Sequence, residues 1–166
     1  MEKDLKTTLE TMMRVFGKKP KEAQAVYSAE CDWKGNLLIE AKMGNFIQKI
    51  DEPEDMGGTN QGPSPLDIQM AALGACQEIM YIAFAAVMEI KLDEVKVKVD
   101  GEIDLRGMFG MDGVPAGFQK INYVTTIKSP ESQEKLEQLV QAVEANCPVL
   151  DTLKRPMEVF GQVVIN

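Results

Sequence analysis

Two cysteines are the residues of this chain whose type and setting would allow redox chemistry. Cys76 lies in the middle of a long apolar run, Pro65 to Ile90, and Cys147 lies where a later amphipathic segment meets Pro148. A thiol within a packed helix and a second thiol at a helix end would suit a redox couple. Two inert core cysteines would look the same, because free cysteine is often fully buried. The third cysteine, Cys31, is predicted to lie on a strand and is interpreted as structural.

The composition argues against several other kinds of chemistry. The 166 residues include no histidine and three cysteines without a close pair, so we expect no histidine-based triad, no metal and no cofactor. A net charge of −8 argues against nucleic acid and anionic membranes as partners. Residues 1–4 are charged and lack an apolar stretch, so we expect no signal peptide and a cytoplasmic protein with reduced thiols.

The apolar run that contains Cys76 is long enough to span a bilayer, but four polar residues interrupt it. These are Gln69, Gln77, Glu78 and Glu89. We interpret the run as a central helix that is buried on nearly every side. One small sheet cannot cover such a helix, so a second copy of the chain is expected to complete its surroundings.

The pattern around this helix predicts helices and strands that are segregated rather than alternating, which is typical of an α+β fold. Residues 1–20 are interpreted as an N-terminal helical extension, and residues 21–166 as a single domain. The predicted helices cover residues 4–16, 65–90, 129–146 and 149–153, and the predicted strands cover residues 23–33, 37–43, 46–51, 95–105, 118–127 and 158–165.

Two regions next to these elements have a predicted role. Ser64 is predicted to cap the long helix, with Pro65 at the first helical position and Asp67 three residues after the cap. Asp67 is therefore expected chiefly to cap its helix. Residues 106–117 form a glycine-rich loop with apolar side chains, which would be a lid over an apolar pocket or a packing surface of a dimer.

Two segments resemble the signatures of the OsmC/Ohr family. The first covers residues 57–76, from Gly-Gly-Thr-Asn through Gly-Pro-Ser-Pro to Ala-Cys, and the second is Asn146-Cys147-Pro148-Val149. The resemblance covers roughly residues 22–166, and the Gly-Pro-Ser-Pro segment is more similar to the less characterised branch of the family. It implies an OsmC-like subunit of order β3-α-β2-α2-β with an extra N-terminal helix. It also implies an intertwined homodimer with buried long central helices.

The resemblance also implies an activity. Family members of known activity are thiol peroxidases that reduce organic hydroperoxides, so a small apolar hydroperoxide would be the substrate. Cys76 would be the peroxidatic thiol and would become a sulfenic acid, and Cys147 would condense with it to a disulfide. A dithiol reductant would then restore both thiols.

The chain departs from the family pattern at the residues that would activate the thiol. Leu66 stands where the peroxidases carry a glutamate, and the acid is one residue later, at Asp67. Lys34 is the only cation near the strand turn where the peroxidases carry an arginine. A non-peroxidatic OsmC-like dimer that binds a small apolar ligand is therefore the alternative function.

Other residues are candidates for supporting a Cys76 thiolate or binding a ligand. A cation brought by the fold would lower the pKa of the thiol, and the candidates are Lys34, Arg106 and Lys120. Gln69 lies seven residues before Cys76 and faces the same way, so it would contact a ligand or an interface partner. A hot-dog-fold thioesterase is disfavoured, because its strand and helix order differs and the cysteine signatures have no role in it.

Overall fold

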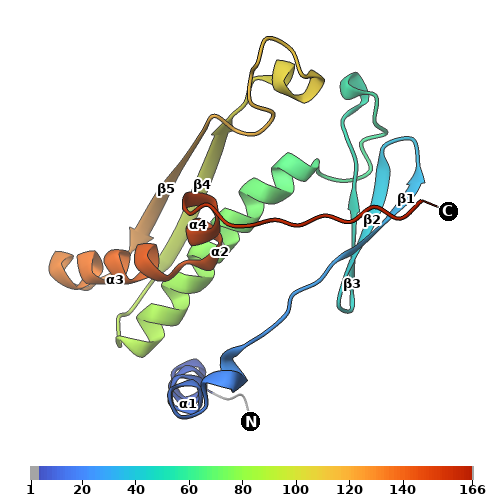
Figure 1. The fold of residues 1–166 in the computed structure, drawn as a ribbon. Coiled ribbons are helices and arrows are strands. Elements are labelled where there is room, and N and C mark those ends of the chain that lie inside the picture. Colours follow the sequence, from blue (N-terminus) through green and yellow to red (C-terminus); the bar gives the residue numbers. More distant parts are fainter. Residues whose placement is uncertain (1–3, 166) are drawn as a thin grey trace. The chain divides into compact units, whose positions relative to one another are not determined.

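The computed structural model describes residues 4–165, and it has an α+β fold, as the sequence predicts (Figure 1). The helices and strands are segregated along the chain rather than alternating. In chain order the elements are α1 (Leu5–Lys18), η1 (Pro20–Ala23), β1 (Glu30–Gly35), β2 (Leu38–Met43), β3 (Phe46–Ile50), η2 (Glu54–Met56), α2 (Pro65–Val87), β4 (Glu94–Glu102), η3 (Leu105–Phe109), β5 (Lys120–Lys128), α3 (Gln133–Asn146) and α4 (Pro148–Lys154).

Contacts between residues divide the chain into two compact units. The first unit comprises Met1–Ala72 and Val99–Asn122, and the second comprises Leu73–Lys98 and Tyr123–Asn166. Helix α2 and strands β4 and β5 each contribute residues to both units. Strands β4 and β5 pair with each other in a two-stranded sheet.

The first unit contains the predicted meander of three antiparallel strands (Figure 1). Trp33 of β1 faces Ile39 of β2, and Ala41 of β2 faces Gln48 of β3. The turn between β1 and β2 contains Asn36 with a φ of 48°, a left-handed conformation that asparagine tolerates better than most residues. The tight turns bring neighbouring strands into antiparallel pairing, with one irregularity of register between Trp33 and Gly35 of β1.

Helix α1 of the first unit is amphipathic, but none of its residues is buried. The Asp4 carboxylate caps it by accepting a hydrogen bond of 3.1 Å from the N–H of Thr7. The helix ends at Lys18, and Pro20 then begins η1, because proline fits the first position of a helical turn.

The second unit contains a hydrophobic core formed by the C-terminal half of α2, by α3 and by the strands that face them. The strands alternate between half-buried and exposed residues, as expected for a sheet with one covered face. Val95 of β4 and Ile127 of β5 pack against this core. Its buried residues are Tyr81, Ala85, Ile90, Leu139 and Val143.

One face of α2 is buried in the chain by itself. The buried residues recur at helical spacing, whereas Ile79 and Ile82 are 63% and 48% exposed. By length and composition α2 would be able to cross a membrane, and the core helix of a soluble protein can have the same length and composition. The buried residues of α2 are Leu73, Gly74, Gln77, Tyr81 and Ala85.

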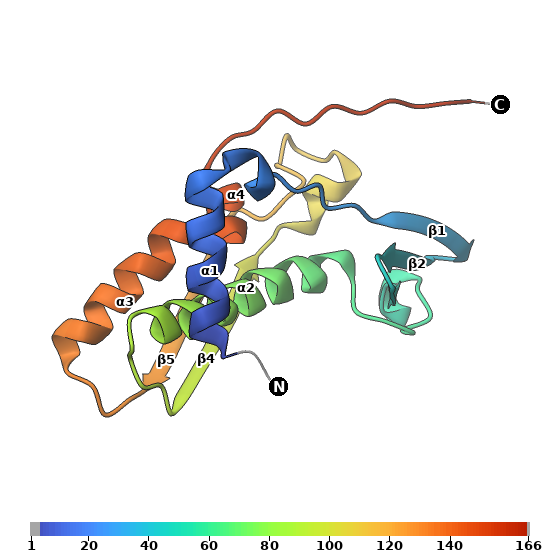
Figure 2. The same ribbon diagram turned by 90° about the horizontal axis from the view of Figure 1, so that it is seen from below.

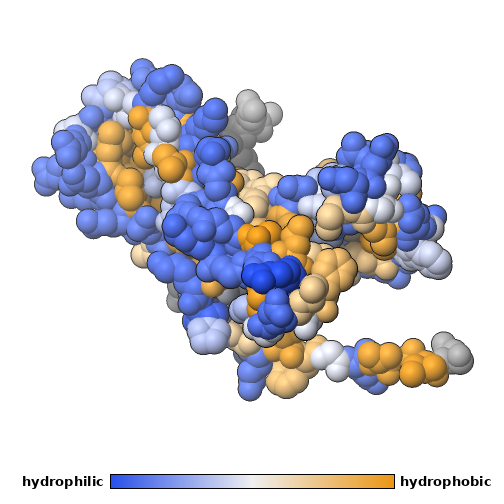
Figure 3. Space-filling model, turned by 90° about the horizontal axis from the view of Figure 1, so that it is seen from above, coloured by the Kyte–Doolittle hydropathy of each residue, from blue (hydrophilic) through white to orange (hydrophobic). Residues whose placement is uncertain are grey.

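The last predicted strand, residues 158–165, is not formed, and the prediction is wrong for the described chain. This segment is extended but pairs with no other strand among the described residues (Figure 2). Its apolar side chains are therefore exposed, for example Val159 at 85% and Ile165 at 90%, and Figure 3 shows hydrophobic residues along it. Strand β1 likewise begins at Glu30 rather than at residue 23, since Tyr27 is 96% exposed and unpaired with any strand.

Candidate active site

Cys147 lies at the junction of α3 and α4, in the second unit. Its backbone N–H donates a hydrogen bond of 2.9 Å to the carbonyl of Val143, which completes α3. Pro148 then begins α4, because proline fits the first position of a helix but cannot continue the preceding one. The side chain of Cys147 is 0% exposed. The junction therefore holds this thiol at a fixed point in the core.

The two cysteines named by the sequence analysis lie together in the second unit. The Sγ atom of Cys147 is 3.4 Å from the Sγ atom of Cys76 on α2, and the Cys147 thiol donates the hydrogen bond. Both are free thiols, and Cys76 is half-buried. A disulfide has a sulfur separation of about 2.05 Å, so a short movement of either side chain would allow the bond to form.

The surroundings of Cys147 keep its thiol protonated. Burial is the largest cause and raises the pKa of Cys147, because a thiolate loses hydration in the core. The hydrogen bond to Cys76 raises the pKa further, whereas the backbone N–H groups of Leu150 and Val149 act in the opposite direction. The net result is a buried neutral thiol that can act as a hydrogen-bond donor.

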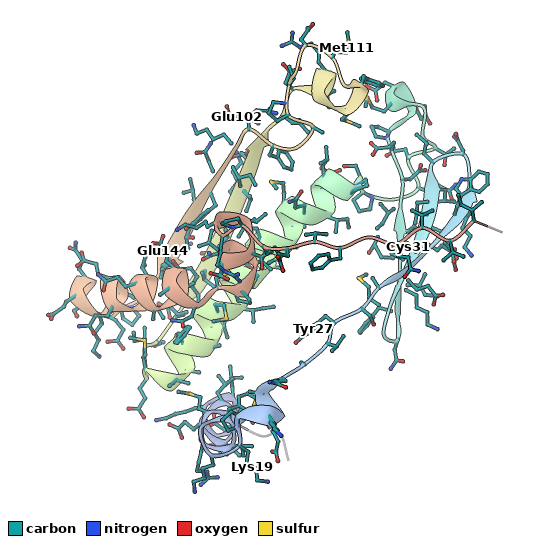
Figure 4. All side chains as sticks on the ribbon, viewed as in Figure 1. Lys19, Tyr27, Cys31, Glu102, Met111 and Glu144 are labelled. Carbon is teal, nitrogen blue, oxygen red and sulfur yellow. The ribbon has the colours of Figure 1, made fainter. Side chains whose placement is uncertain are left out.

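Polar side chains that the sequence analysis did not select lie in the same unit. The hydroxyl of Tyr123 donates a hydrogen bond of 3.1 Å to Oε1 of Glu144, a residue of α3 three positions before Cys147 (Figure 4). Burial and this hydrogen bond raise the pKa of Tyr123 to about 12. Tyr81 is 2% exposed, and burial raises its pKa as well. In the sequence, the three-residue spacing between Glu144 and Cys147 was the signal that could have identified Glu144 as a neighbour of the thiol.

Gln77, the residue after Cys76, is also fully buried. Neither its side-chain nitrogen nor its side-chain oxygen has a hydrogen-bond partner among the residues that the structure describes. Buried polar groups are normally hydrogen-bonded, so this amide is an uncommon feature beside a candidate nucleophile. In the sequence it was recognised only as an interruption of an apolar run.

The predicted cations Lys34 and Arg106 belong to the first unit, and each is paired with carboxylates there. The Nζ atom of Lys34 is 3.5 Å from Oε2 of Glu40. Arg106 lies between Asp104 and Asp112 and donates hydrogen bonds to both carboxylates. These hydrogen bonds, chiefly the one to Asp104, raise the pKa of the Arg106 guanidinium. Both cations therefore have carboxylate partners within their own unit.

The remaining predicted site residues also belong to the first unit. The N–H of Ser64 donates to Oδ2 of Asp67 at 3.0 Å, and the N–H of Asp67 donates to the Ser64 hydroxyl at 3.2 Å. This reciprocal pair is a capping box, so the predicted capping role of Asp67 is confirmed. Lys120 pairs with Glu102 at 3.7 Å, and Gln69 is exposed on α2.

The first unit also contains an open pocket of about 410 Å³ at the start of α2. Leu66, at the position where the peroxidases carry a glutamate, contributes to its lining. Gly101 leaves room for the ring of Phe118, because a Cβ at that position would lie 2.4 Å from the ring. The pocket is lined by Ser64, Leu66, Asp67, Met70, Val99, Asp100, Gly101, Ile103 and Phe118.

Within residues 4–165, no group of three or more His, Cys, Asp or Glu side chains is arranged to hold a metal ion. The arrangement in the second unit is instead a pair of thiols in an α+β subunit, one half-buried and one fully buried.

Residues 58–160 match the family of OsmC-like proteins, and the chain belongs to this family. The family predicted from the two cysteine signatures is therefore confirmed. A hydroperoxide reductase from Mycoplasma genitalium is 29% identical over 116 residues, which cover 69% of this chain and 77% of that protein.

Solved structures show the same fold. An OsmC-like protein from Mycoplasma pneumoniae superimposes with a TM-score of 0.68 at 21% identity, over 79% of this chain and 89% of that chain. An organic hydroperoxide resistance protein from Legionella pneumophila gives a TM-score of 0.57 at 20% identity, over 78% of this chain and 90% of that chain. The names of the Mycoplasma genitalium and Legionella pneumophila proteins refer to hydroperoxides.

Proposed function

We propose that this protein is a thiol peroxidase that reduces small organic hydroperoxides. The observation that carries the proposal is the 3.4 Å separation of the Cys76 and Cys147 sulfurs within one compact unit. Membership of the OsmC-like family and the similarity to a hydroperoxide reductase support the same activity.

The two thiols have different roles in the proposed cycle. Cys76 is half-buried and is the sulfur that a substrate reaches, whereas Cys147 is fully buried and protonated. Thiolate character and access govern thiol reactivity, so Cys76 is the nucleophile toward the peroxide. Cys147 is the resolving thiol, because a neutral buried thiol reacts only with a neighbouring sulfur.

The proposed reaction proceeds in three steps. The Cys76 thiolate attacks the terminal peroxide oxygen; a sulfur–oxygen bond forms, the oxygen–oxygen bond breaks, and the alkoxide takes up a proton and leaves as the alcohol. The Cys147 sulfur then attacks the sulfenic sulfur, and the hydroxide leaves as water with the proton of Cys147. A dithiol reductant finally exchanges with the disulfide and restores both thiols.

The proposal includes a homodimer in the cytoplasm. Ile79 and Ile82 on α2 and the extended apolar segment 157–165 are exposed in the single chain, and a second copy would cover such surfaces. The cytoplasm supplies dithiol reductants and keeps thiols reduced.

A second candidate function is the binding of a small apolar ligand without peroxide chemistry. The pocket of about 410 Å³ at the start of α2 favours it, because its size and its combination of apolar and polar lining residues are typical of small-molecule sites. This function predicts saturable binding of an apolar probe with no consumption of hydroperoxide.

The test is the turnover of cumene hydroperoxide with dithiothreitol as the reductant. We expect the wild-type protein to turn over and the Cys76→Ser variant to lose essentially all activity, since no sulfenic acid can form. One equivalent of peroxide should produce the Cys76–Cys147 disulfide, detectable by peptide mass spectrometry. Cys31→Ser is the matched control and should retain full activity. No wild-type turnover, or unchanged turnover in Cys76→Ser, would contradict the proposal.

A further inference from the structure

We propose that Cys147 also activates Cys76, because its buried thiol donates a hydrogen bond that stabilises the Cys76 thiolate. The inference rests on the proposed function, in which Cys76 is the nucleophile, and it adds a role for Cys147 before any disulfide forms. Cys147 would thus be both the activating and the resolving group of this site.

Ionisation of Cys76 would give the hydrogen bond a direction, because a thiolate sulfur can only accept. Cys147 is then the donor and the Cys76 sulfur the acceptor, at a sulfur separation of 3.4 Å. A thiolate is a better acceptor than a neutral thiol, so a donor at this place favours the charged form of Cys76. The hydrogen bond is also stronger in the core than in water, because the surroundings of Cys147 are desolvated.

Cys147 is suited to remain the donor. It is fixed between α3 and α4, where its N–H bonds to Val143 and Pro148 starts the next helix. Burial raises the pKa of its thiol, so Cys147 holds its proton more firmly than an exposed thiol would. Of the two sulfurs, the half-buried one at position 76 has better access to water to carry the charge.

The inference also explains how the site would function without the family's usual activators. Leu66 replaces the glutamate, and Lys34 is paired with Glu40 and with Asp32. Cys76 lies about three turns into α2, beyond the reach of the positive helix N-terminus. The hydrogen bond from Cys147 is the polar contact that the described structure gives to the Cys76 sulfur.

The experiment measures the alkylation rate of Cys76 by iodoacetamide as a function of pH, without peroxide. It uses the full chain carrying Cys31→Ser, with the labelled site identified by mass spectrometry. Cys147→Ser keeps a hydroxyl donor, and Cys147→Ala removes the donor. We expect the serine variant to label Cys76 as the parent does. We expect the alanine variant to label it about tenfold more slowly at neutral pH, with the rate profile moved to higher pH.

Equal rates in the parent, serine and alanine proteins would overturn the inference. If the alanine variant fails to fold, the thiolate absorbance of the parent protein, measured as a function of pH, tests the inference instead. The inference requires one thiolate per chain to appear well before the second, and simultaneous ionisation contradicts it. The outcome is separate from that of the peroxidase proposal. Slow alkylation in Cys147→Ala together with no wild-type peroxide turnover would support the hydrogen bond and reject the peroxidase activity.

Discussion

The carboxylate of Asp51 organises the loop that leads into α2. Asp51 is 1% exposed, and it accepts hydrogen bonds from the N–H groups of Glu52, Thr59 and Gln61 and from the Thr59 hydroxyl at 2.6 Å. The Thr59 hydroxyl is the largest cause of the lowered pKa of Asp51, while burial opposes it. Gly58 cannot be replaced without a shift of the loop, because its Cβ would lie 1.8 Å from the carbonyl oxygen of Glu52.

Asp51→Asn should therefore reduce stability in a pH-dependent way. The folded pKa of Asp51 lies below its unfolded value of about 3.9, so its stabilising contribution is complete above that pH and is lost as the pH falls through the folded pKa. We expect the variant to be less stable than wild type at neutral pH and to lose less on acidification. Urea unfolding at neutral pH and at about pH 3 measures both effects.

The matched control for this prediction is Asp55→Asn, which changes an exposed carboxylate of the same loop. It should leave the neutral-pH stability within about 0.5 kcal/mol of wild type. Equal effects of the two substitutions would show that the Asp51 hydrogen bonds do not hold the loop.

The thiol pair could be predicted from the sequence, but its polar surroundings could not. Cys76 and Cys147 were identified because their flanking residues form two recognisable signatures. Tyr123 and Glu144 carry no such signature, and their hydrogen bond exists only once β5 and α3 are folded. Lys34 was a reasonable candidate cation, but its pairing with the carboxylate of Glu40 is a property of strand register, which composition does not reveal.

The start of α2 shows what local sequence determines well. Ser64, Pro65 and Asp67 were predicted to cap and begin this helix, and the structure has the reciprocal hydrogen bonds of a capping box. Capping depends on residues a few positions apart, so no distant contact is needed to recognise it. The helix bounds therefore agree with the prediction at this end.

Removing the cap should cost a measurable part of the stability. Ser64→Ala leaves the N–H of Asp67 without its side-chain acceptor, and we expect a loss of about 1 kcal/mol in the free energy of unfolding. Urea unfolding monitored by circular dichroism gives this value. Ser64→Thr keeps the hydroxyl and serves as the control. A loss in the threonine variant as large as that in the alanine variant would show that the hydroxyl is not the stabilising group.

The strands show where local sequence is insufficient. The meander was predicted because its turns and alternation are local, and β1, β2 and β3 pair as expected. The segment 158–165 has the composition of a strand, but a strand also needs a partner edge, and the described chain provides none. Whether residues 158–165 form a strand therefore depends on pairing with a segment distant in the sequence, and not on their strand propensity.

At the scale of the whole molecule, much apolar surface is exposed in the single chain. Ile79 and Ile82 project from α2, and Met108, Phe109 and Met111 are exposed on the glycine-rich loop, whose tip carries Met111 (Figure 4). Soluble monomers seldom expose so many large apolar side chains. The homodimer proposed for this chain would remove such surface from water.

Light scattering after size-exclusion chromatography should give twice the 18.4 kDa mass of the chain. Ile79→Glu places a charge on the exposed face of α2 and should weaken the association at least tenfold, because burying an unpaired carboxylate is costly. Gln138→Glu, at an exposed position of α3, adds the same charge and should leave the mass unchanged. A wild-type mass of one chain at every concentration would refute the dimer.

The burial of Cys147 affects how quickly the proposed substrate would inactivate the protein. Sulfinic and sulfonic acids form irreversibly when excess peroxide reaches a sulfenic acid. Cys147 has no exposed surface, so of the two paired thiols only Cys76 is open to this damage, and only between its oxidation and the closing of the disulfide. The two sulfurs lie only 3.4 Å apart, so that interval is short. The number of cycles completed before permanent inactivation would then depend on the mobility of α3 and α4, which carry the second sulfur.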